Sequence, residues 1–376
     1  MSEGPLSGLL VIALEQAVAA PLCTVRLADA GARVIKIERE GGETARGYDT
    51  TVKGSSAYFV WLNRGKESAV LDLKGAGVAT LFAMLERADV LVQNLVPGAL
   101  ARLGLTPAVI ASRFPRLIAV SINGYGQDTP YASMRAYDML VQAESGLCAV
   151  TGTPETPVKI GVSAADIATG MSAHAAILEA LIERGQTGRG QQIEIAMFDA
   201  VADWMAVPLL HHEQAGRETG RHGLSHASIY PYRPFDCADG RLIVATQTNA
   251  EWCALCAALG REDLATRPEF ATNPLRVANR LALDAALEPV FARLTQDDAI
   301  ARLTTAGIAW GRFTEVQDLG RHPALRRIEV QIETGERVTL PRPAGRDARF
   351  HPGPIPALGA QTEAILQEFA TRPDSD

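Results

Sequence analysis

Short apolar runs alternate with stretches of helical periodicity through the first half of the chain, and this alternation limits the fold more than any other feature of the sequence. The apolar runs have the length and composition of buried strands, and they lie at residues 9–14, 33–38, 68–73, 90–94, 117–124 and 191–197. Apolar residues recur at helical spacing at 19–32, about 75–87 and 164–185. Strands that alternate with helices predict an α/β fold with a doubly wound, mostly parallel sheet.

The composition changes near residue 216, where the stretch GRETGRHGLSHASIYPYRPFD is rich in Gly, Arg, His, Tyr and Pro. Such a stretch is typical of a linker or a functional loop. Strand-like and helical patterns resume at 241–247, 250–260, 281–294, 296–306 and 308–313. We therefore predict a large α/β domain over residues 1–215, a linker over 216–227, a smaller α+β domain over 228–325 and a C-terminal segment over 326–376.

A formal net charge of −7 over 376 residues provides no broad basic surface for nucleic acid or for an anionic membrane. Five cysteines, an odd number, favour reduced thiols and a cytoplasmic location over a disulfide framework. Charged residues interrupt the apolar stretches well before the ~20 residues that a membrane span requires. The start of the sequence, MSEGPLSG, does not resemble a signal peptide. We expect neither nucleic-acid nor membrane binding.

Two pairs of residues have spacings that are found in metal sites: Cys253 with Cys256, and His222 with His226. The two cysteines, however, belong to an apolar helical stripe. With Asn249 as the helix N-cap, the thiols would lie away from the helix N-terminus, where a thiolate is favoured. The pattern therefore favours core cysteines, and we predict no metal site.

Basic and polar residues recur where the predicted strands end. Ligands of doubly wound sheets bind outside the carboxyl ends of the strands. Lys36, Lys74, Asn94 and Arg102 are therefore candidates for holding a phosphorylated cofactor. Any one of these cations could instead be a solvated surface residue, and it is their recurrence after strand ends that favours a site.

One acid, Asp138, stands inside the otherwise apolar stretch AYDMLV, where we expect Tyr137 and Met139 to bury it in part. A carboxylate in such a place must be capped, paired or used. Asp is a favoured N-cap, so Asp138 could cap the helix that follows, although Val141 at the third helical position excludes a capping box. The alternative is a functional carboxylate that points into a pocket.

Segments in family order along nearly the whole chain make it resemble the class III CoA-transferases, the family of formyl-CoA:oxalate and carnitine CoA-transferases. These segments are PLSGLLVIALEQAVAAPLCTVRLADAGARVIKIE, NRGKESAVLDLK, VQNLVPGALARLGL, SINGYGQDTPYASMRAYD, GRGQQIEIAMFDA and YPYRPFDCADGRL. The resemblance implies that Asp138 is a nucleophile that forms a mixed anhydride and then an aspartyl-CoA thioester. It also implies that CoA is contacted by Gln16, Ala17, Leu71, Lys74, Asn94, Leu95 and Arg102.

The resemblance further implies an acyl-CoA and a free carboxylic acid as substrates, no permanently bound cofactor, an interlocked homodimer, and a C-terminal segment that returns to the large domain. The stretch RHGLSHASIYPYRPF is similar to relatives that act on short dicarboxylates such as succinate, mesaconate, itaconate or citramalate. Arg135, Tyr137 and His226 are then substrate-binding candidates, with Arg221 and Arg233 as further cations. His226 either binds substrate or only orders its loop. Transfer within mesaconyl-CoA and transfer from succinyl-CoA to another acid both stay open.

Two other functions stay open. The α-methylacyl-CoA racemases of the same superfamily use a histidine directly before this aspartate and a second aspartate downstream. This chain has Tyr137 at the first position and Asp166 as a candidate for the second. A phenol, with a reference pKa of about 10, is a poor base near neutral pH, which favours the transferase. The third possibility is a CoA-binding protein without catalysis, in which Asp138 only caps a helix. The groups that would stabilise an oxyanion are not identifiable from the sequence.

Overall fold

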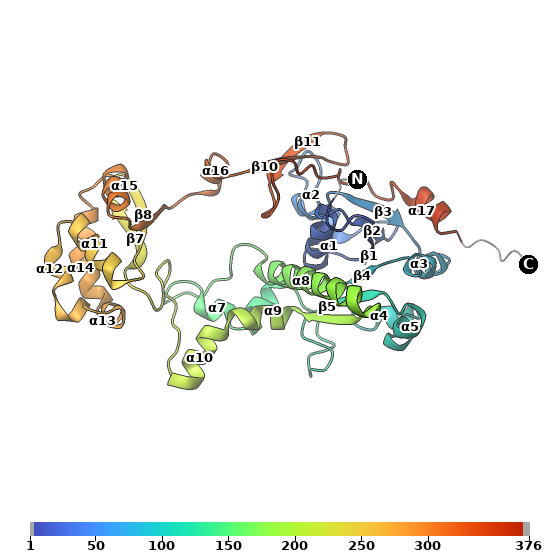
Figure 1. Ribbon diagram of the computed structural model, residues 1–376, viewed down its shortest axis with the longest axis horizontal. Coiled ribbons are helices and arrows are strands. Elements are labelled where there is room, and N and C mark those ends of the chain that lie inside the picture. Colours follow the sequence, from blue (N-terminus) through green and yellow to red (C-terminus); the bar gives the residue numbers. More distant parts are fainter. Residues whose placement is uncertain (1–3, 371–376) are drawn as a thin grey trace, which may run out of the picture. The chain divides into compact units, whose positions relative to one another are not determined.

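The computed structural model describes residues 4–370 and divides into two compact units (Figure 1). Unit 1 holds the chain up to residue 147, residues 160–206 and the chain from residue 326 onward, and unit 2 holds residues 148–159 and 207–325. The boundary predicted at 215 therefore lies later than the structural one at 206. Residues 148–159, which the sequence patterns grouped with the large domain, belong to unit 2.

Unit 1 is built on a six-stranded parallel sheet with the order β3-β2-β1-β4-β5-β6. Its strands are β1 (Leu10–Leu14), β2 (Arg33–Glu38), β3 (Lys66–Val70), β4 (Val90–Gln93), β5 (Ile118–Asn123) and β6 (Gln192–Ala196). The α/β class and the parallel sheet are confirmed, although β3 ends three residues before the predicted run does. The strand order reverses between β1 and β4, which makes the carboxyl ends of these strands the expected ligand edge.

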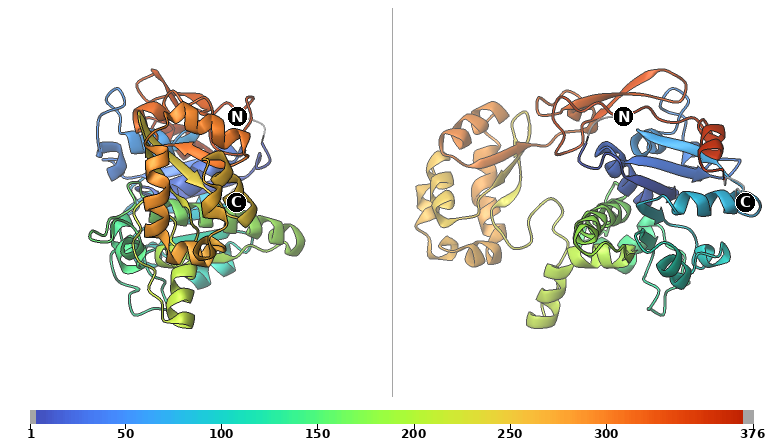
Figure 2. Two further views of the ribbon diagram at one scale, coloured as in Figure 1. Left: turned by 90° about the vertical axis from the view of Figure 1, so that its left-hand side faces the viewer. Right: turned by 45° about the vertical axis from the view of Figure 1, so that its right-hand side comes forward.

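Helices cover both faces of this sheet because successive side chains of each strand point to opposite sides. On one face, Leu10, Ile12 and Leu14 of β1 pack in a core with α3 (Gly77–Leu85), α5 (Pro107–Arg113) and α17 (Thr362–Glu368). On the other face, Val11 and Ala13 pack with α1 (Ala19–Asp29) and α8 (Ala164–Thr187). Figure 2 shows α8 running alongside the strands.

By length and composition alone, α8 could cross a membrane, and it is the one such helix between residues 4 and 370. Its Ala173, Ile177 and Ala180 are buried in the core that covers β1, β4 and β5. We therefore assign α8 as a sheet-covering helix of unit 1.

The C-terminal segment packs on both α2 and the edge strand of unit 1. Its hairpin, β10 (Arg327–Gln331) and β11 (Arg337–Pro341), buries Ile328 and Val330 against α2 (Ala57–Leu62). Further along, the Gln361 and Thr362 side chains accept hydrogen bonds from the backbone N–H groups of Ser68 and Val70, at 2.8 and 2.9 Å. The open edge of β3 is thus covered by the end of the chain, as exposed edge strands require.

Shorter helices complete unit 1. They are η1 (Thr44–Gly47), α4 (Ala99–Arg102), α6 (Asp138–Glu144) and α9 (Met197–Trp204). Two helices span the limits between the units, namely α7 (Leu147–Val150) and α10 (Ala206–Ala215).

Unit 2 is a three-stranded antiparallel sheet, β7-β8-β9, packed with helices around its own core. The strands are β7 (Tyr232–Cys237), β8 (Gly240–Ala245) and β9 (Ala309–Arg312). The helices are α11 (Asn249–Ala258), α12 (Glu262–Ala265), η2 (Pro268–Phe270), α13 (Asn273–Ala278), α14 (Arg280–Phe291), α15 (Gln296–Thr305) and α16 (Val316–Leu319). The sequence patterns missed β7, because its first residues belong to the Gly-, Arg-, His-, Tyr- and Pro-rich stretch that is typical of a loop. As an edge strand, β7 tolerates Pro234.

Candidate active site

Asp138 is the first residue of α6, and Tyr137 before it is the N-cap. Asp138 is partly buried, as expected, although Tyr137 and Met139 beside it are 67% and 59% exposed. The capping hypothesis is wrong for this helix, since α6 has no side-chain cap. The Asp138 carboxylate instead bonds the Gln142 side chain of α6 and the backbone at the start of α8.

Three hydrogen bonds hold the half-buried Asp138 carboxylate in one orientation. Its Oδ1 accepts from the backbone N–H groups of Ala165, at 2.8 Å, and Asp166, at 3.3 Å. Its Oδ2 accepts from Nε2 of Gln142, at 2.7 Å. Ala165 and Asp166 lie in the first turn of α8, whose N-cap Ser163 makes no side-chain capping bond. Asp138 therefore caps α8, where the N–H groups and the helix dipole favour an anion.

Gln142 connects this carboxylate to the chain that leads into α8. Its side chain is fully buried, and its Oε1 accepts a hydrogen bond from the Ile160 N–H at 2.9 Å. The amide is therefore engaged at both ends, which fixes which end faces Asp138. Sequence reasoning missed Gln142, which lies one helical turn beyond the acid that it orients.

A second carboxyl group, that of Asp166, lies beside the first. Burial, followed by the charge of Asp138, raises the pKa of Asp166 to about 7 from an ordinary 3.8, although a hydrogen bond from the Ala19 backbone opposes the shift. Near neutral pH this carboxyl is therefore divided between its protonated and ionised forms. Such a perturbed group is a mark of functional sites.

A pocket of about 660 Å³ opens at the carboxyl ends of β1, β2 and β3. Four of the predicted CoA contacts line it, namely Gln16, Leu71, Lys74 and Leu95, and Arg39 lines it as well. Asn94 does not line the pocket but exchanges two hydrogen bonds with the Gln16 backbone, at 2.9 and 2.8 Å. The structure thus brings these predicted residues together at one edge of the sheet.

Lys36 has no access to this pocket. Its ammonium is fully buried and pairs with Glu15 Oε1 at 3.2 Å and Glu43 Oε1 at 2.7 Å. Because a charge buried with two partners cannot reach a ligand without leaving them unpaired, we no longer expect Lys36 to touch a cofactor.

The buried charges around Lys36 instead shape the loop after β1. Glu15 also pairs with Lys66, at 2.6 Å, and the Glu43 Oε2 accepts the Ala17 N–H at 2.7 Å. Ala17 has a left-handed φ of 62°, which is unfavourable for a residue with a side chain. Burial raises the pKa of Glu15, but Lys36 and Lys66 outweigh it and hold the value at about 2. The cluster therefore holds Ala17 in this unfavourable conformation, directly after Gln16, which lines the pocket.

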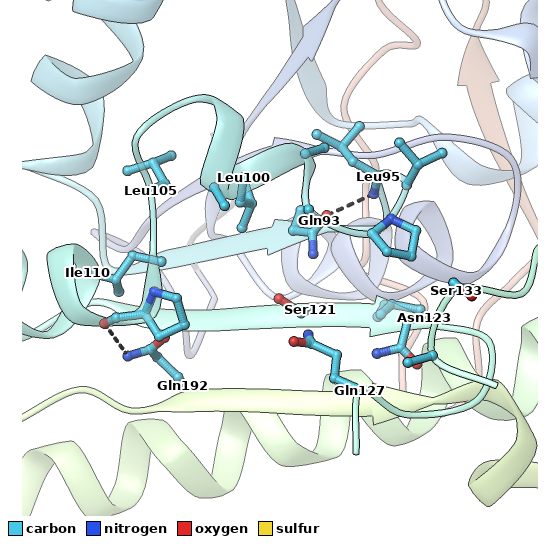
Figure 3. Close-up of a pocket in the computed structure, with 18 residues that line it drawn as sticks. Gln93, Leu95, Leu100, Leu105, Ile110, Ser121, Asn123, Gln127, Ser133 and Gln192 are labelled. Carbon is cyan, nitrogen blue, oxygen red and sulfur yellow. Dashed lines mark hydrogen bonds between the residues drawn. The ribbon is translucent and has the colours of Figure 1, made fainter. Parts of the chain in front are cut away.

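A second pocket, of about 360 Å³, lies over β4, β5 and β6 (Figure 3). Its polar side chains are uncharged, including Gln93, Ser121 and Asn123, and its apolar floor includes Leu100 and Ile110. Asp138 does not line it. Arg102, a predicted CoA contact, lines neither pocket and is exposed on α4.

The predicted substrate cations have different surroundings. Arg221 donates to the carbonyl oxygens of Ala149, Thr153 and Pro154, so it fastens a loop of unit 2. Arg233 pairs with Asp284 at 2.5 Å and Glu288 at 2.9 Å.

Arg135 is exposed and makes no ion pair within the part of the chain that the structure describes.

His226 has one nitrogen engaged and one open. Its ring stacks on Tyr232 with centroids 5.4 Å apart, and its Nδ1 accepts the Ser228 N–H at 3.0 Å. A neutral His226 therefore carries its proton on Nε2, where it can donate. His226 orders its loop, and it keeps one donor for a ligand.

The Cys-x-x-Cys pair lies on α11, which begins with a capping box of Thr248 and Glu251, so Asn249 is not the N-cap. Cys253 is exposed and Cys256 is buried. Burial raises the pKa of the Cys256 thiol to about 12, so this thiol stays protonated near neutral pH.

The α/β fold and the oriented Asp138 carboxylate form a candidate catalytic site, and comparison with known proteins identifies the family. The family model described as CoA-transferase family III matches residues 6–362. The chain belongs to this family, whose members use CoA thioesters as substrates.

Two curated relatives and one solved structure are similar over almost the whole chain. An acetyl-CoA:oxalate CoA-transferase of Acetobacter aceti is 35% identical over 98% of this chain and 96% of its own. A succinyl-CoA:glutarate CoA-transferase of Mus musculus is 32% identical over 98% and 87%. The crystal structure of a CAIB/BAIF family protein from Brucella suis has a TM-score of 0.82 at 34% identity, and covers 98% of this chain and 100% of that one.

Proposed function

We propose that this enzyme moves CoA from an acyl-CoA to a free carboxylic acid through a covalent intermediate on Asp138. The observation that carries the proposal is the Asp138 carboxylate itself, which three hydrogen bonds orient while it stays half-buried. A carboxylate nucleophile splits a thioester exchange into two easier steps and needs no metal or redox group.

The pocket at the ends of β1, β2 and β3 is the proposed site for CoA. Lys74 and Arg39 supply cations at its wall, and Leu71 and Leu95 supply apolar surface. Phosphate groups and an adenine ring need these two kinds of contact. Ala17 and Asn94 act here by shaping the loop that carries Gln16.

The acids that exchange CoA are proposed to be short dicarboxylates. The relatives named above use oxalate and glutarate, both of which carry a second carboxylate. Arg135 supports this proposal, because it is exposed three residues before Asp138 and has no acidic partner among residues 4–370. A succinyl-CoA donor with a mesaconate-, itaconate- or citramalate-type acceptor fits, as does transfer within mesaconyl-CoA.

A cytoplasmic homodimer is the proposed form of the protein. Large apolar side chains stay exposed on unit 1 near Asp138, including Tyr137, Met139 and Leu140. On α8, Met171 and Ile182 are 58% and 66% exposed. Monomeric proteins rarely leave such groups together in water, so a second copy is the proposed cover. Sedimentation of the pure protein tests this form.

A racemase-like reaction is the second candidate, since Asp166 has a pKa suited to proton transfer. Deuterium from solvent entering the α-position of a branched acyl-CoA would support it. Tyr137, which is 67% exposed, stands where the racemases have their histidine base, and a phenol with a reference pKa of about 10 is a poor second base near neutral pH.

The deciding experiment is Asp138→Asn, assayed with a panel of acyl-CoA donors and dicarboxylic acids by mass spectrometry. The amide can still accept from the α8 N–H groups, so we expect a folded protein with no transfer. Hydroxylamine added with acyl-CoA should modify Asp138 in the wild type and nothing in the variant. Transfer by the variant would show that another residue is the nucleophile. If the wild type binds acyl-CoA but transfers nothing, the protein would be a CoA-binding protein without catalysis.

A further inference from the structure

The two oxygens of Asp138 are not equivalent. A carboxylate oxygen has two in-plane lone pairs. On Oδ1 both lone pairs are used, by the N–H groups of Ala165 and Asp166. On Oδ2 one is used, by Gln142, so one stays available. Attack on an acyl carbonyl must therefore start from Oδ2.

The donors to the two oxygens also differ in kind. Ala165 and Asp166 belong to the first turn of a 24-residue helix, and Ala165 is fully buried, so their N–H groups are fixed in place. They also lie at the positive end of the helix dipole. The Gln142 donor is a side-chain amide on the seven-residue α6. Oδ1 thus faces a rigid, electropositive pair of donors.

We propose that the backbone N–H groups of Ala165 and Asp166 form the oxyanion hole for Asp138's own carbonyl during the transfer. This inference rests on the proposed function, because it concerns the acylated state of the same residue. In the resting enzyme these N–H groups donate to the Asp138 carboxylate, which caps α8. In the reaction they stabilise the negative charge that develops on Oδ1.

The bond changes show where the charge goes. Oδ2 attacks the acyl-CoA carbonyl, the carbon–sulfur bond breaks, and the CoA thiolate leaves with its electron pair. The mixed anhydride has Oδ2 as its bridge and Oδ1 as a carbonyl oxygen. The thiolate then attacks Cγ of Asp138, negative charge collects on Oδ1, and the Cγ–Oδ2 bond breaks to release the donor acid as its carboxylate.

The second half runs the same steps in reverse. The incoming carboxylate attacks Cγ of the aspartyl thioester, and charge again collects on Oδ1 before the thiolate leaves. The thiolate then attacks the incoming acid's carbonyl, and Asp138 regains its carboxylate with one oxygen from that acid. No proton is taken up or released. Both attacks on Cγ therefore use the same pair of donors.

Replacing Ala165 by Pro removes one of these donors, and Ala164→Pro is its matched control. The Ala164 N–H donates to the Val162 carbonyl at 2.8 Å and not to Asp138. Proline is accepted in the first helical turn, and Pro274 already holds the second position of α13. Each variant thus loses one N–H from the same turn of α8, but only one of them loses a bond to Oδ1.

The measurement is the formation and decay of the Asp138–CoA thioester, followed by quenching and mass spectrometry of the peptide that contains Asp138. For Ala165→Pro we expect kcat, and the rate at which hydroxylamine cleaves the thioester, to fall by about 10²- to 10³-fold, the usual effect of losing one oxyanion donor. Ala164→Pro should change both rates by less than about threefold while losing a similar amount of stability. Equal rates in the two variants, with the adduct still formed, would overturn the inference.

A second measurement uses the wild type alone and serves if Ala165→Pro does not fold. With ¹³C at Cγ of aspartate, the infrared band of the thioester carbonyl should lie at lower frequency in the folded enzyme than in the same adduct after acid unfolding. An unshifted band would overturn the oxyanion hole and leave the covalent mechanism intact. An absence of any Asp138 adduct would overturn the proposed function itself.

Discussion

Replacing Asp166 by Asn should make the enzyme more stable at pH 8 and make much less difference at pH 5. The Asp166 carboxyl has a pKa of about 7 in the folded chain, against 3.8 ordinarily, because burial and the charge of Asp138 both oppose ionisation. The folded state therefore holds a proton that the unfolded state releases, so stability is present at low pH and falls as the pH rises from about 4 to 7. An asparagine keeps the shape and never ionises.

The pKa of Asp166 lies about 3 above its ordinary value, at about 7 against 3.8, and this difference sets the scale. At about 1.4 kcal/mol for each unit, ionised Asp166 costs the folded state up to about 4 kcal/mol above pH 7. At pH 5 the cost is about 1.7 kcal/mol, since only the unfolded state is then ionised. The advantage of Asp166→Asn over the wild type should therefore grow by about 2.5 kcal/mol between pH 5 and pH 8.

Urea unfolding at both pH values, followed by circular dichroism, measures this difference, and the pH dependence of groups that do not interact with Asp166 cancels between the two proteins. Asp138→Asn provides the control, because it removes the neighbouring charge and leaves Asp166 buried. With the Asp138→Asn protein as the background, the pH-dependent advantage of Asp166→Asn should shrink but persist, since burial is the larger cause. An advantage of Asp166→Asn that is equal at pH 5 and pH 8 would refute the reasoning.

Three further changes test other parts of the site. Gln142→Ala removes the donor to Asp138 Oδ2 and should lower kcat by about 10- to 100-fold in steady-state assays, since a hydrogen bond to a charged group is worth about 1.5–3 kcal/mol. An unchanged kcat would show that Gln142 has only a structural role. Lys36→Met removes the cation that pairs with the buried carboxylates of Glu15 and Glu43, and it should lower the free energy of unfolding in urea by about 3–5 kcal/mol. An unaltered unfolding midpoint would contradict the pairing. Lys74→Met should raise the KM for acyl-CoA several-fold at constant kcat, and the effect should be larger at low salt than at high salt. Arg113→Met is the control, because Arg113 forms an exposed ion pair with Glu86, and it should leave KM unchanged.

The parallel sheet was predictable because its strands are buried on both faces and are therefore continuous apolar runs. The importance of Asp138 was also visible, as a charge inside an apolar stretch. Its actual surroundings were not, because Ala165 lies 27 residues away and contributes only a backbone N–H, which leaves no mark on the sequence.

The position of Lys36 differs from the prediction for another reason. The sequence pattern suggests a residue at a strand end, but Lys36 lies inside β2 between Ile35 and Ile37, both of which are buried. A lysine in the middle of a buried strand predicts a buried partner. The candidate partners visible in the sequence are Glu15, directly after an apolar run, and Glu43, after a turn, and both pair with Lys36 in the structure.

The edge of β3 has a consequence for how the chain is made. The Gln361 side chain that accepts the Ser68 N–H is 293 residues further along the sequence. At about 5–20 residues per second, a ribosome needs roughly 15 to 60 seconds to supply that partner. Throughout that interval the nascent sheet exposes a strand ready to pair with any other extended chain, so protection by a chaperone matters most before the last helix emerges.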